Sequence, residues 1–268
     1  MSRQTDPPGF PHDTIGIIGA GHLGMSLAEA LIDRGFPRGN LLISHAGSPA
    51  THAAIQEAGL EHNLTENGEL SRRSSVIFIT VRPQSVAILE GLPFPRDGII
   101  VSCMAGIPRA LLKKMLGIDV IRMMPSGPDT IRHHKGIVAI YPDNATLVRL
   151  LAGMGLKVHV LPDKEAMHLF TAGVCLPAAI LAYRATGLDP DDGMNEAVRE
   201  YPLLASMYAW AREVLPEFSS GPEEEGYVTK MCTPGGVTNA IVRSIRSGNT
   251  LSAAVQAGIA RSREISRE

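Results

Sequence analysis

Short apolar runs alternate with amphipathic stretches over the first 162 residues of the chain. The runs have the β-branched composition of buried strands, and in the stretches between them apolar side chains recur at helical spacing. Strands that alternate with helices predict an α/β domain built on a doubly wound, mostly parallel sheet. The expected strands are residues 15–18, 40–44, 76–81, 99–103, 119–123, 136–141 and 157–161, and the expected helices are residues 23–34, 49–58, 84–89, 108–116 and 144–154.

The pattern changes near Pro162. From Asp163 onward no run has the character of a strand, and stretches rich in Ala, Leu and Met predict helices alone. The expected helices are residues 164–186, 194–215, 236–246 and 251–264, with breaks at 187–193 and 216–222. We therefore expect an α/β domain over residues 14–162 and an all-helical C-terminal domain over 163–268. Residues 1–13 are polar and Pro-rich, and are expected to form a flexible tail rather than a signal peptide or targeting helix.

Composition excludes several classes of partner. The formal net charge is -2 and aromatic residues make up 4% of the chain, which gives no electrostatic or stacking case for nucleic acid. The same charge gives no case for an anionic membrane surface. The longest apolar run, residues 172–183, is too short to span a bilayer. We expect neither nucleic acid nor a membrane as a partner.

The cysteines and histidines show no catalytic or metal-binding pattern. Cys103, Cys175 and Cys232 lie far apart without a C-x-x-C motif, which suits a reducing, cytoplasmic compartment. Each is interpreted as a buried small residue rather than a nucleophile. The nine histidines show no metal-ligand spacing, so no metal site is expected.

The strongest local signal is TIGIIGAGHLG, residues 14–24. An apolar strand ends at Gly19, a G-x-G-x-x-G motif follows, and a helix begins at Leu23, which is the order that a dinucleotide site requires. Gly19 allows a tight turn, Gly21 lets the backbone approach a pyrophosphate, and Gly24 lets the helix pack closely on the strand. This context predicts a Rossmann-type cofactor site. The alternative is a glycine-rich turn in an ordinary α/β domain.

The residues after the second strand favour NADP(H) over NAD(H). In a Rossmann unit they meet the adenosine ribose, where an acidic residue would favour NAD. The segment reads Ser44, His45, Ala46, Gly47 and Ser48, with no acid. Small hydroxyls and an imidazolium could hold a 2′-phosphate, although the usual Arg is missing. The alternative is a polar loop without a ligand.

A second glycine segment, CTPGGVTNAI, covers residues 232–241. A Pro-Gly-Gly turn that opens a helix presents backbone N–H groups without acceptors, and Thr233 and Thr238 add hydroxyls. This combination predicts a carboxylate-binding turn.

Together the two glycine segments resemble the pyrroline-5-carboxylate reductase family. Shorter stretches agree: VRPQ (81–84) resembles the family's V-K-P-Q turn, CMAGIP (103–108) its A-A-G-V/I segment, and IRMMPS (121–126) its R-x-M-P-N. The ending AVQAGIARSREIS resembles the family's last helix. The likeness runs from about Ile15 to Ser266, and the T-P-G-G-x-T turn is its most specific part.

The resemblance implies a function and a set of residues. The family reduces the cyclic imine Δ1-pyrroline-5-carboxylate to proline with NAD(P)H, and hydride transfer to an imine needs mainly alignment and a protonated nitrogen. Thr238 is implied as the catalytic residue, through a hydrogen bond to the ring nitrogen. The implied substrate-carboxylate residues are Thr233, Gly236, Val237 and Thr238. The implied cofactor residues are Gly19, Ala20, Gly21, His22, Leu23 and Gly24 at the pyrophosphate, Ser44, His45 and Ser48 at the adenosine end, and Val81, Arg82, Pro83, Ala105 and Gly106 beside the ribose and nicotinamide.

Three departures from the family pattern stand out. Arg82 replaces Lys, which keeps the charge but changes its geometry. Ser126 replaces Asn, with fewer hydrogen bonds available. The family's S-G-S-G-P-A becomes GVCLPA, residues 173–178, so that Val174 and Leu176 stand where glycines are expected. These two side chains would either enter the site or fill the core, and the sequence leaves both interpretations open.

The sequence therefore predicts a cytoplasmic, NAD(P)H-dependent reductase of a cyclic imino acid. One alternative is a reductase of another imino or oxo acid, and a second is a cofactor-binding paralogue without turnover. The helical domain has more apolar faces than a lone bundle of its size would bury, and in the resembling family this domain interlocks with a second copy. A homodimer or a multiple of it is expected.

Overall fold

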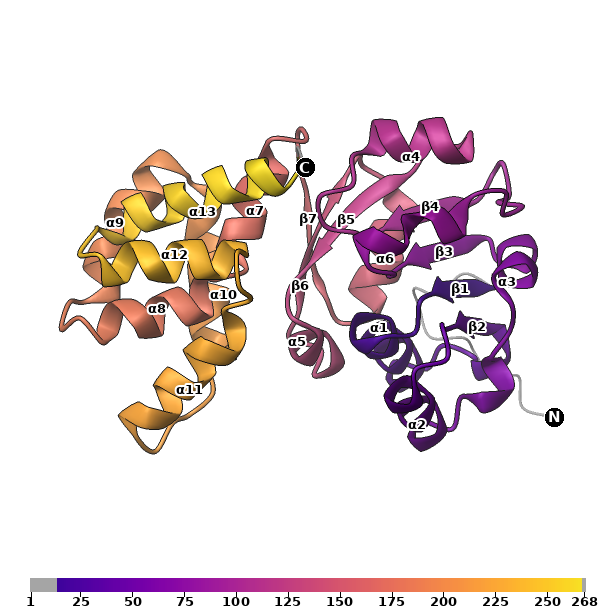
Figure 1. Cartoon of the computed structure of the whole chain (residues 1–268), viewed down its shortest axis with the longest axis horizontal. Helices are drawn as coiled ribbons and strands as arrows, with labels where there is room; N and C mark the ends of the chain where they lie inside the picture. The colour runs from indigo at the N-terminus through magenta and orange to yellow at the C-terminus, as the bar shows by residue number, and fades with distance from the viewer. Residues whose placement is uncertain (1–13, 267–268) are drawn as a thin grey trace. The chain divides into compact units, whose positions relative to one another are not determined.

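A computed structural model describes residues 14–266, so the expected tail 1–13 lies outside the described residues. The chain forms two compact units that divide between Pro162 and Asp163. Figure 1 draws the first unit from indigo through magenta to rose and the second from salmon through orange to yellow.

The first unit contains a seven-stranded sheet in the order β2-β1-β3-β4-β5-β6-β7. Strands β2, β1, β3, β4 and β5 are mutually parallel, β6 runs antiparallel to β5, and β7 is parallel to β6. The expected doubly wound, mostly parallel sheet is confirmed. The strands are β1 (Ile15–Ile18), β2 (Leu41–Ser44), β3 (Val76–Ile79), β4 (Ile99–Ser102), β5 (Ile121–Pro125), β6 (Ile137–Tyr141) and β7 (Lys157–Val160).

Helices cover both faces of this sheet because successive strand residues point to opposite sides. Ile17 and Phe78 pack in one apolar cluster with residues of α1, α2, α5 and α6. Ile18 and Ile79 pack in another with residues of α3, η3 and α4. The helices of this unit are α1 (His22–Asp33), η1 (Arg38–Asn40), α2 (Pro49–Glu57), η2 (Glu61–Asn63), α3 (Asn67–Arg73), η3 (Pro83–Leu89), α4 (Arg109–Leu116), α5 (Pro128–Arg132) and α6 (Ala145–Gly153).

The main differences from the sequence expectation in this unit are short, polar helices. The sequence of α3, NGELSRR, and the five residues of α5 carry too few apolar positions to show a helical period. The expected helix 84–89 is the 3-10 helix η3. The expected strand 76–81 is shortened to Val76–Ile79, and the expected strand 119–123 is shifted to Ile121–Pro125.

The second unit is helical throughout its described residues. Its long C-terminal helices pack against each other and against α7 and α8. Helix α11 packs on α8, and Figure 1 shows α11 extending from one side of the other helices of this unit. The helices are α7 (Ala166–Gly173), α8 (Leu176–Arg184), α9 (Pro190–Glu200), α10 (Leu203–Val214), α11 (Gly221–Met231), α12 (Val237–Arg246) and α13 (Leu251–Ile265).

Two of the long helices expected in this unit are wrong, because each is two helices. The stretch 164–186 divides into α7 and α8, which meet at 52°. The stretch 194–215 belongs to α9 and α10, which divide at Tyr201 and Pro202. A proline disfavours helical geometry in the residue before it, and Tyr201 has φ -128° and ψ 83°. The expected break 187–193 is shorter than predicted, because the Asp189 side chain caps α9 by accepting from the N–H of Asp191 at 2.9 Å.

In the described part of the chain, no single helix has the length and apolar character to cross a membrane. Helices α7 and α8 pass such a test only as a bent pair. The residues Leu176–Tyr183 of α8 are all buried, as in a core helix.

Candidate functional site

The turn after β1 is held by the strands on both sides of it. The N–H groups of Gly19 and Ala20 both donate to the carbonyl oxygen of Ser44, at 3.1 and 2.7 Å. Directly after β3, the Thr80 hydroxyl donates to the carbonyl oxygen of Gly19 at 2.7 Å. Gly19 has φ +100°, a conformation that favours glycine. The turn is therefore fixed before any ligand binds.

The other two glycines of the motif meet different surroundings. A Cβ atom on Gly24 would lie 2.4 Å from the carbonyl oxygen of Gly19, so only glycine allows α1 to pack this closely on the turn. A Cβ atom on Gly21 would meet nothing within 4 Å. The space beside Gly21 is open at the entrance to α1, where a pyrophosphate would lie.

Backbone donors point into this space. Gly21 is the N-cap of α1 and no side chain caps the helix. Within residues 14–266, the N–H groups of His22, Leu23 and Gly24 have no hydrogen-bond acceptor. Three such groups at the N-terminus of a helix of 12 residues are an arrangement that suits an anion.

Ala20, which the resemblance implies at the pyrophosphate, has no side-chain surface or N–H group available to a ligand in this structure. Its side chain is fully buried, and its N–H group is taken by Ser44. Its role in the fold is to join the turn to β2.

The loops that follow β2, β1, β3 and β4 lie along one edge of the sheet, because these strands are parallel. Val81 lies directly beside the turn, since its Cγ1 atom would be 2.7 Å from a Cβ on Gly19. Arg82 is exposed and, among the described residues, makes no hydrogen bond or ion pair. The sheet thus gathers at this edge Gly19, Gly21, His22, Leu23, Gly24, His45, Ser48, Val81, Arg82, Pro83, Ala105 and Gly106.

The residues expected at the adenosine end differ in how far their side chains are available to a ligand. Ser44 is 5% exposed and its hydroxyl donates to Oδ1 of Asn67 at 2.6 Å, so it serves the fold rather than a ligand. Ser48 is exposed at the N-cap of α2 and its side chain makes no capping bond. His52, which the sequence interpretation missed, lies on α2 with its ring 6.0 Å from that of His45. The feature of the sequence that could have pointed to His52 is its position four residues after Ser48, one helical turn along α2.

Two other buried groups near this edge serve the fold. Ser126 is 3% exposed; its hydroxyl bonds that of Thr130 at 2.7 Å and accepts from the N–H of Ile137 at 3.1 Å. It therefore connects β5, α5 and β6. Burial raises the pKa of the Cys103 thiol to about 12, so this cysteine stays protonated and unreactive at neutral pH.

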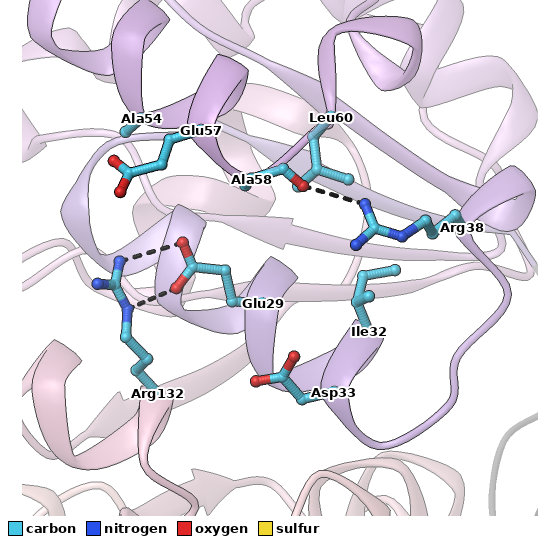
Figure 2. A pocket seen from close by; sticks show the side chains of 9 residues that line it. All are labelled: Glu29, Ile32, Asp33, Arg38, Ala54, Glu57, Ala58, Leu60 and Arg132. Atoms are coloured by element: carbon cyan, nitrogen blue, oxygen red, sulfur yellow. Dashed lines mark hydrogen bonds and ion pairs between the residues drawn. The ribbon is translucent and has the colours of Figure 1, made fainter.

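A pocket of about 410 Å³ lies elsewhere in the first unit (Figure 2). It follows the C-terminal halves of α1 and α2, whereas the glycine turn precedes the N-terminus of α1. Arg132 donates to Glu29 at 3.1 Å across it, and burial raises the pKa of Glu29. Arg38 donates to the carbonyl oxygen of Ala58 at 3.0 Å. These contacts join helices, and the pocket is separate from the cofactor edge.

In the second unit, the turn before α12 is also rigid. Gly235 has φ +71°, and the N–H of Gly236 donates to the carbonyl oxygen of Thr233 at 2.9 Å. From α13, Nε of Arg261 donates to the carbonyl oxygen of Gly235 at 2.6 Å. The last long helix therefore holds the turn in place.

This turn leaves the start of α12 open. Gly236 is the N-cap, and no side chain caps the helix. The N–H groups of Val237, Thr238 and Asn239 have no acceptor in the part of the chain that the structure describes. An anionic group would complete them. Thr233 is exposed beside them and Thr238 is half-buried.

The Thr238 hydroxyl contacts a residue that the sequence interpretation did not place at the site. It donates to Sγ of Cys175 at 3.1 Å, and Sγ donates to the carbonyl oxygen of Thr171 at 3.3 Å. Burial raises the pKa of Cys175 to about 11, although the hydrogen bond from Thr238 acts in the opposite direction. Cys175 and Thr238 are 63 residues apart, and no local pattern connects them.

The departure at GVCLPA has two outcomes in the structure. Leu176 is fully buried within the helical unit, where it packs as a core residue. Val174 is half-buried at the break between α7 and α8. The core interpretation therefore fits Leu176, whereas Val174 keeps an accessible surface near Cys175.

The chain is similar in sequence and fold to known proteins. A family model described as "NADP oxidoreductase coenzyme F420-dependent" matches residues 14–106. The chain is 28% identical over 266 residues to a pyrroline-5-carboxylate reductase of Pisum sativum, covering 94% of this chain and 96% of that protein. It is 29% identical over 282 residues to pyrroline-5-carboxylate reductase 2 of Macaca fascicularis, covering 94% and 83%. The solved structure of a Plasmodium falciparum pyrroline carboxylate reductase with NADP bound has the same fold, with a TM-score of 0.61 and 19% identity over 96% of this chain and 100% of that one.

The parallel sheet and the open glycine turn have the arrangement of a Rossmann-type dinucleotide site, and the family model that matches this region describes NADP oxidoreductases. The resemblance to the pyrroline-5-carboxylate reductase family, first indicated by the motifs, is confirmed over nearly the whole chain.

Proposed function

We propose that the protein reduces a cyclic imino acid with NAD(P)H, and that this substrate is Δ1-pyrroline-5-carboxylate, reduced to proline. The observation that carries the proposal is that two helices of ten or more residues, α1 and α12, each begin after a glycine N-cap with no side-chain cap, so that their first N–H groups lack acceptors. The first suits a pyrophosphate and the second a carboxylate. Relatives that match 94% of the chain are named for this reaction.

The residues present fit the cofactor. The N–H groups of His22, Leu23 and Gly24 would hold the pyrophosphate, and the open space beside Gly21 would admit it. Val81 and Arg82, next to the turn, would flank the ribose. The bound nicotinamide supplies a hydride to the substrate carbon.

At α12, the protein would hold the substrate at two points. The N–H groups of Val237 and Thr238 would bind the carboxylate, with the Thr233 hydroxyl beside them. The Thr238 hydroxyl would meet the ring nitrogen. Hydride transfer to an imine needs mainly alignment and a protonated nitrogen, so these contacts would serve chiefly to align the substrate.

We further infer that NADPH is preferred to NADH. The exposed Ser48 hydroxyl at the N-cap of α2, with His45 and His52 nearby, would favour a 2′-phosphate, and no acidic residue would repel it. With the Ser44 hydroxyl already bonded, Ser48 carries most of this inference. The three free cysteines remain in keeping with the cytoplasmic location expected from the sequence.

A screen of dinucleotide oxidation tests function and cofactor together. With Δ1-pyrroline-5-carboxylate we expect NADPH oxidation, with kcat/KM about tenfold higher than with NADH, as one favourable phosphate contact would give. Six-membered cyclic imino acids and 2-oxo acids serve as competing substrates. The alternative is a preference for a substrate ring of another size, because the Val174 side chain keeps an accessible surface near Cys175. NADPH binding without turnover of any imino acid would favour the non-catalytic alternative, and faster reaction with NADH would contradict the assignment of Ser48.

We also propose a homodimer or a multiple of it, assembled through the helical unit. In helix α11 only Val228 is buried, while Tyr227 and Met231 are half-buried and keep part of their apolar surface accessible. A second copy would cover this surface. Sedimentation at micromolar concentration should give at least twice the 28.6 kDa chain mass. An active monomer at that concentration would contradict this proposal.

A further inference from the structure

The hydroxyl of Thr238 has its single proton already engaged. A hydroxyl carries one donor hydrogen and two acceptor lone pairs. Its hydrogen is donated to Sγ of Cys175 at 3.1 Å, from the first turn of α12 to the break between α7 and α8. The hydroxyl oxygen can therefore only accept further hydrogen bonds, through its lone pairs.

The direction of this hydrogen bond is fixed by a second one. Sγ of Cys175 donates to the carbonyl oxygen of Thr171 at 3.3 Å. That carbonyl lies in the last turn of α7, where helical carbonyls lack backbone donors, and within residues 14–266 no backbone N–H reaches it. The thiol hydrogen is therefore drawn to Thr171, and the sulfur lone pairs are left for Thr238.

The thiol is protonated under ordinary conditions. Burial raises the pKa of Cys175 to about 11, so at neutral pH the group has a hydrogen to donate. A thiolate would accept from Thr238 but would leave the Thr171 carbonyl without its donor.

We propose that Cys175 is a positioning residue that turns the Thr238 hydroxyl so that its oxygen lone pairs, not its proton, face the substrate. This inference rests on the proposed function. An acceptor at this place selects a ring nitrogen that carries a hydrogen, which is the protonated imine. It gives no donor to the carbonyl oxygen of a 2-oxo acid, so it also selects imine over ketone.

The chemistry balances without a proton from the protein. The hydride adds to the imine carbon, the π electron pair of the C=N bond moves to nitrogen, and the nitrogen keeps the hydrogen that Thr238 accepts. Cys175 and Thr238 finish the reaction in the protonation states in which they began.

Four variants test the inference in the full-length protein: Cys175→Ala, Cys175→Ser, Thr238→Val and the double variant Cys175→Ala with Thr238→Val. The substrate is Δ1-pyrroline-5-carboxylate with saturating NADPH. Since one neutral hydrogen bond is lost, we expect Cys175→Ala to lower kcat/KM about tenfold with NADPH affinity unchanged. Cys175→Ser, which can both accept and donate, should restore most of the activity. Thr238→Val should lower kcat/KM about 100-fold, because a hydrogen bond to a charged nitrogen is lost.

The double variant separates positioning from packing. If Cys175 acts through Thr238, then Cys175→Ala has no further effect on kcat/KM once Thr238 is Val. Additive losses in kcat/KM, or a Cys175→Ser variant no more active than Cys175→Ala, would overturn the inference. The proposed function would be unaffected by either result, because it is tested by the activity of the wild-type protein.

A spectroscopic arm needs no substrate. The infrared S–H stretch of Cys175, assigned as the band missing in Cys175→Ser, should move in Thr238→Val, while those of Cys103 and Cys232 stay in place. An unchanged Cys175 band would overturn the inference. If the wild-type protein reduces no imino acid, the proposed function is wrong. The substrate role given to Thr238 and Cys175 is then also wrong, even if the S–H band of Cys175 shifts in Thr238→Val.

Discussion

Replacing Gly21 with valine is expected to lower NADPH affinity by about 100-fold while the protein stays folded. The valine side chain would fill the open space beside the first turn of α1 and block a pyrophosphate from the N–H groups of His22 and Leu23. Losing hydrogen bonds to a charged group costs about 3 kcal/mol, which corresponds to roughly two orders of magnitude in affinity. Fluorescence titration with NADPH measures the change.

The fold should tolerate this substitution. Gly21 has φ -74° and ψ -164°, an extended conformation open to any residue, and a Cβ there meets nothing within 4 Å. Valine is a poorer N-cap than glycine, so a loss of up to about 1 kcal/mol of stability is expected.

Gly24→Val is the matched control, three residues further along the same motif. Its Cβ would lie 2.4 Å from the carbonyl oxygen of Gly19, a backbone atom that cannot move without breaking the turn. We expect this variant to lose both stability and binding. Unchanged NADPH affinity in Gly21→Val would mean that the dinucleotide binds elsewhere.

Leu176→Gly is expected to destabilise the protein by about 4 kcal/mol or more. Leu176 is fully buried in the first turn of α8, and removing such a side chain costs about 3–5 kcal/mol, with up to about 1 kcal/mol added by glycine in a helix. Urea unfolding, followed by circular dichroism, measures the free energy of unfolding.

Val174→Gly provides the comparison within the same motif. Val174 is half-buried and lies outside both helices, so a smaller loss of about 1 kcal/mol is expected. If Leu176→Gly were as stable as the wild type and reduced the pyrroline substrate faster, Leu176 would belong to the pocket and not to the core.

The sequence predicted those parts of the fold that local chemistry dictates. The apolar runs at Ile15–Ile18 and Ile137–Tyr141 are strands because their side chains are buried on both faces of a sheet. The reasons given for Gly19 and Gly24, a tight turn and close packing, match the positive φ of the one and the 2.4 Å approach of the other.

What the sequence could not provide depends on contacts between distant segments. Ser44 looked like a ligand residue until α3, a polar helix without periodicity, brought Asn67 to its hydroxyl. Cys175 looked like a small core residue, and only the packing of α8 against α12 brings it to Thr238. The helix break at Tyr201–Pro202 was missed for a local reason: Pro202 marks it in the sequence, but the apolar period continues across it.

The carbonyl oxygen of Ser44 has a practical consequence for protein engineering. Because it accepts from both Gly19 and Ala20, the loop after β2 and the glycine turn after β1 share one anchor atom. An attempt to change coenzyme preference by redesigning the end of β2 would disturb turn geometry and electron-carrier affinity together. Libraries that vary Ser48 and His52 instead would leave that anchor atom in place. Coenzyme preference could then be changed without weakening the contacts proposed between the glycine turn and the diphosphate.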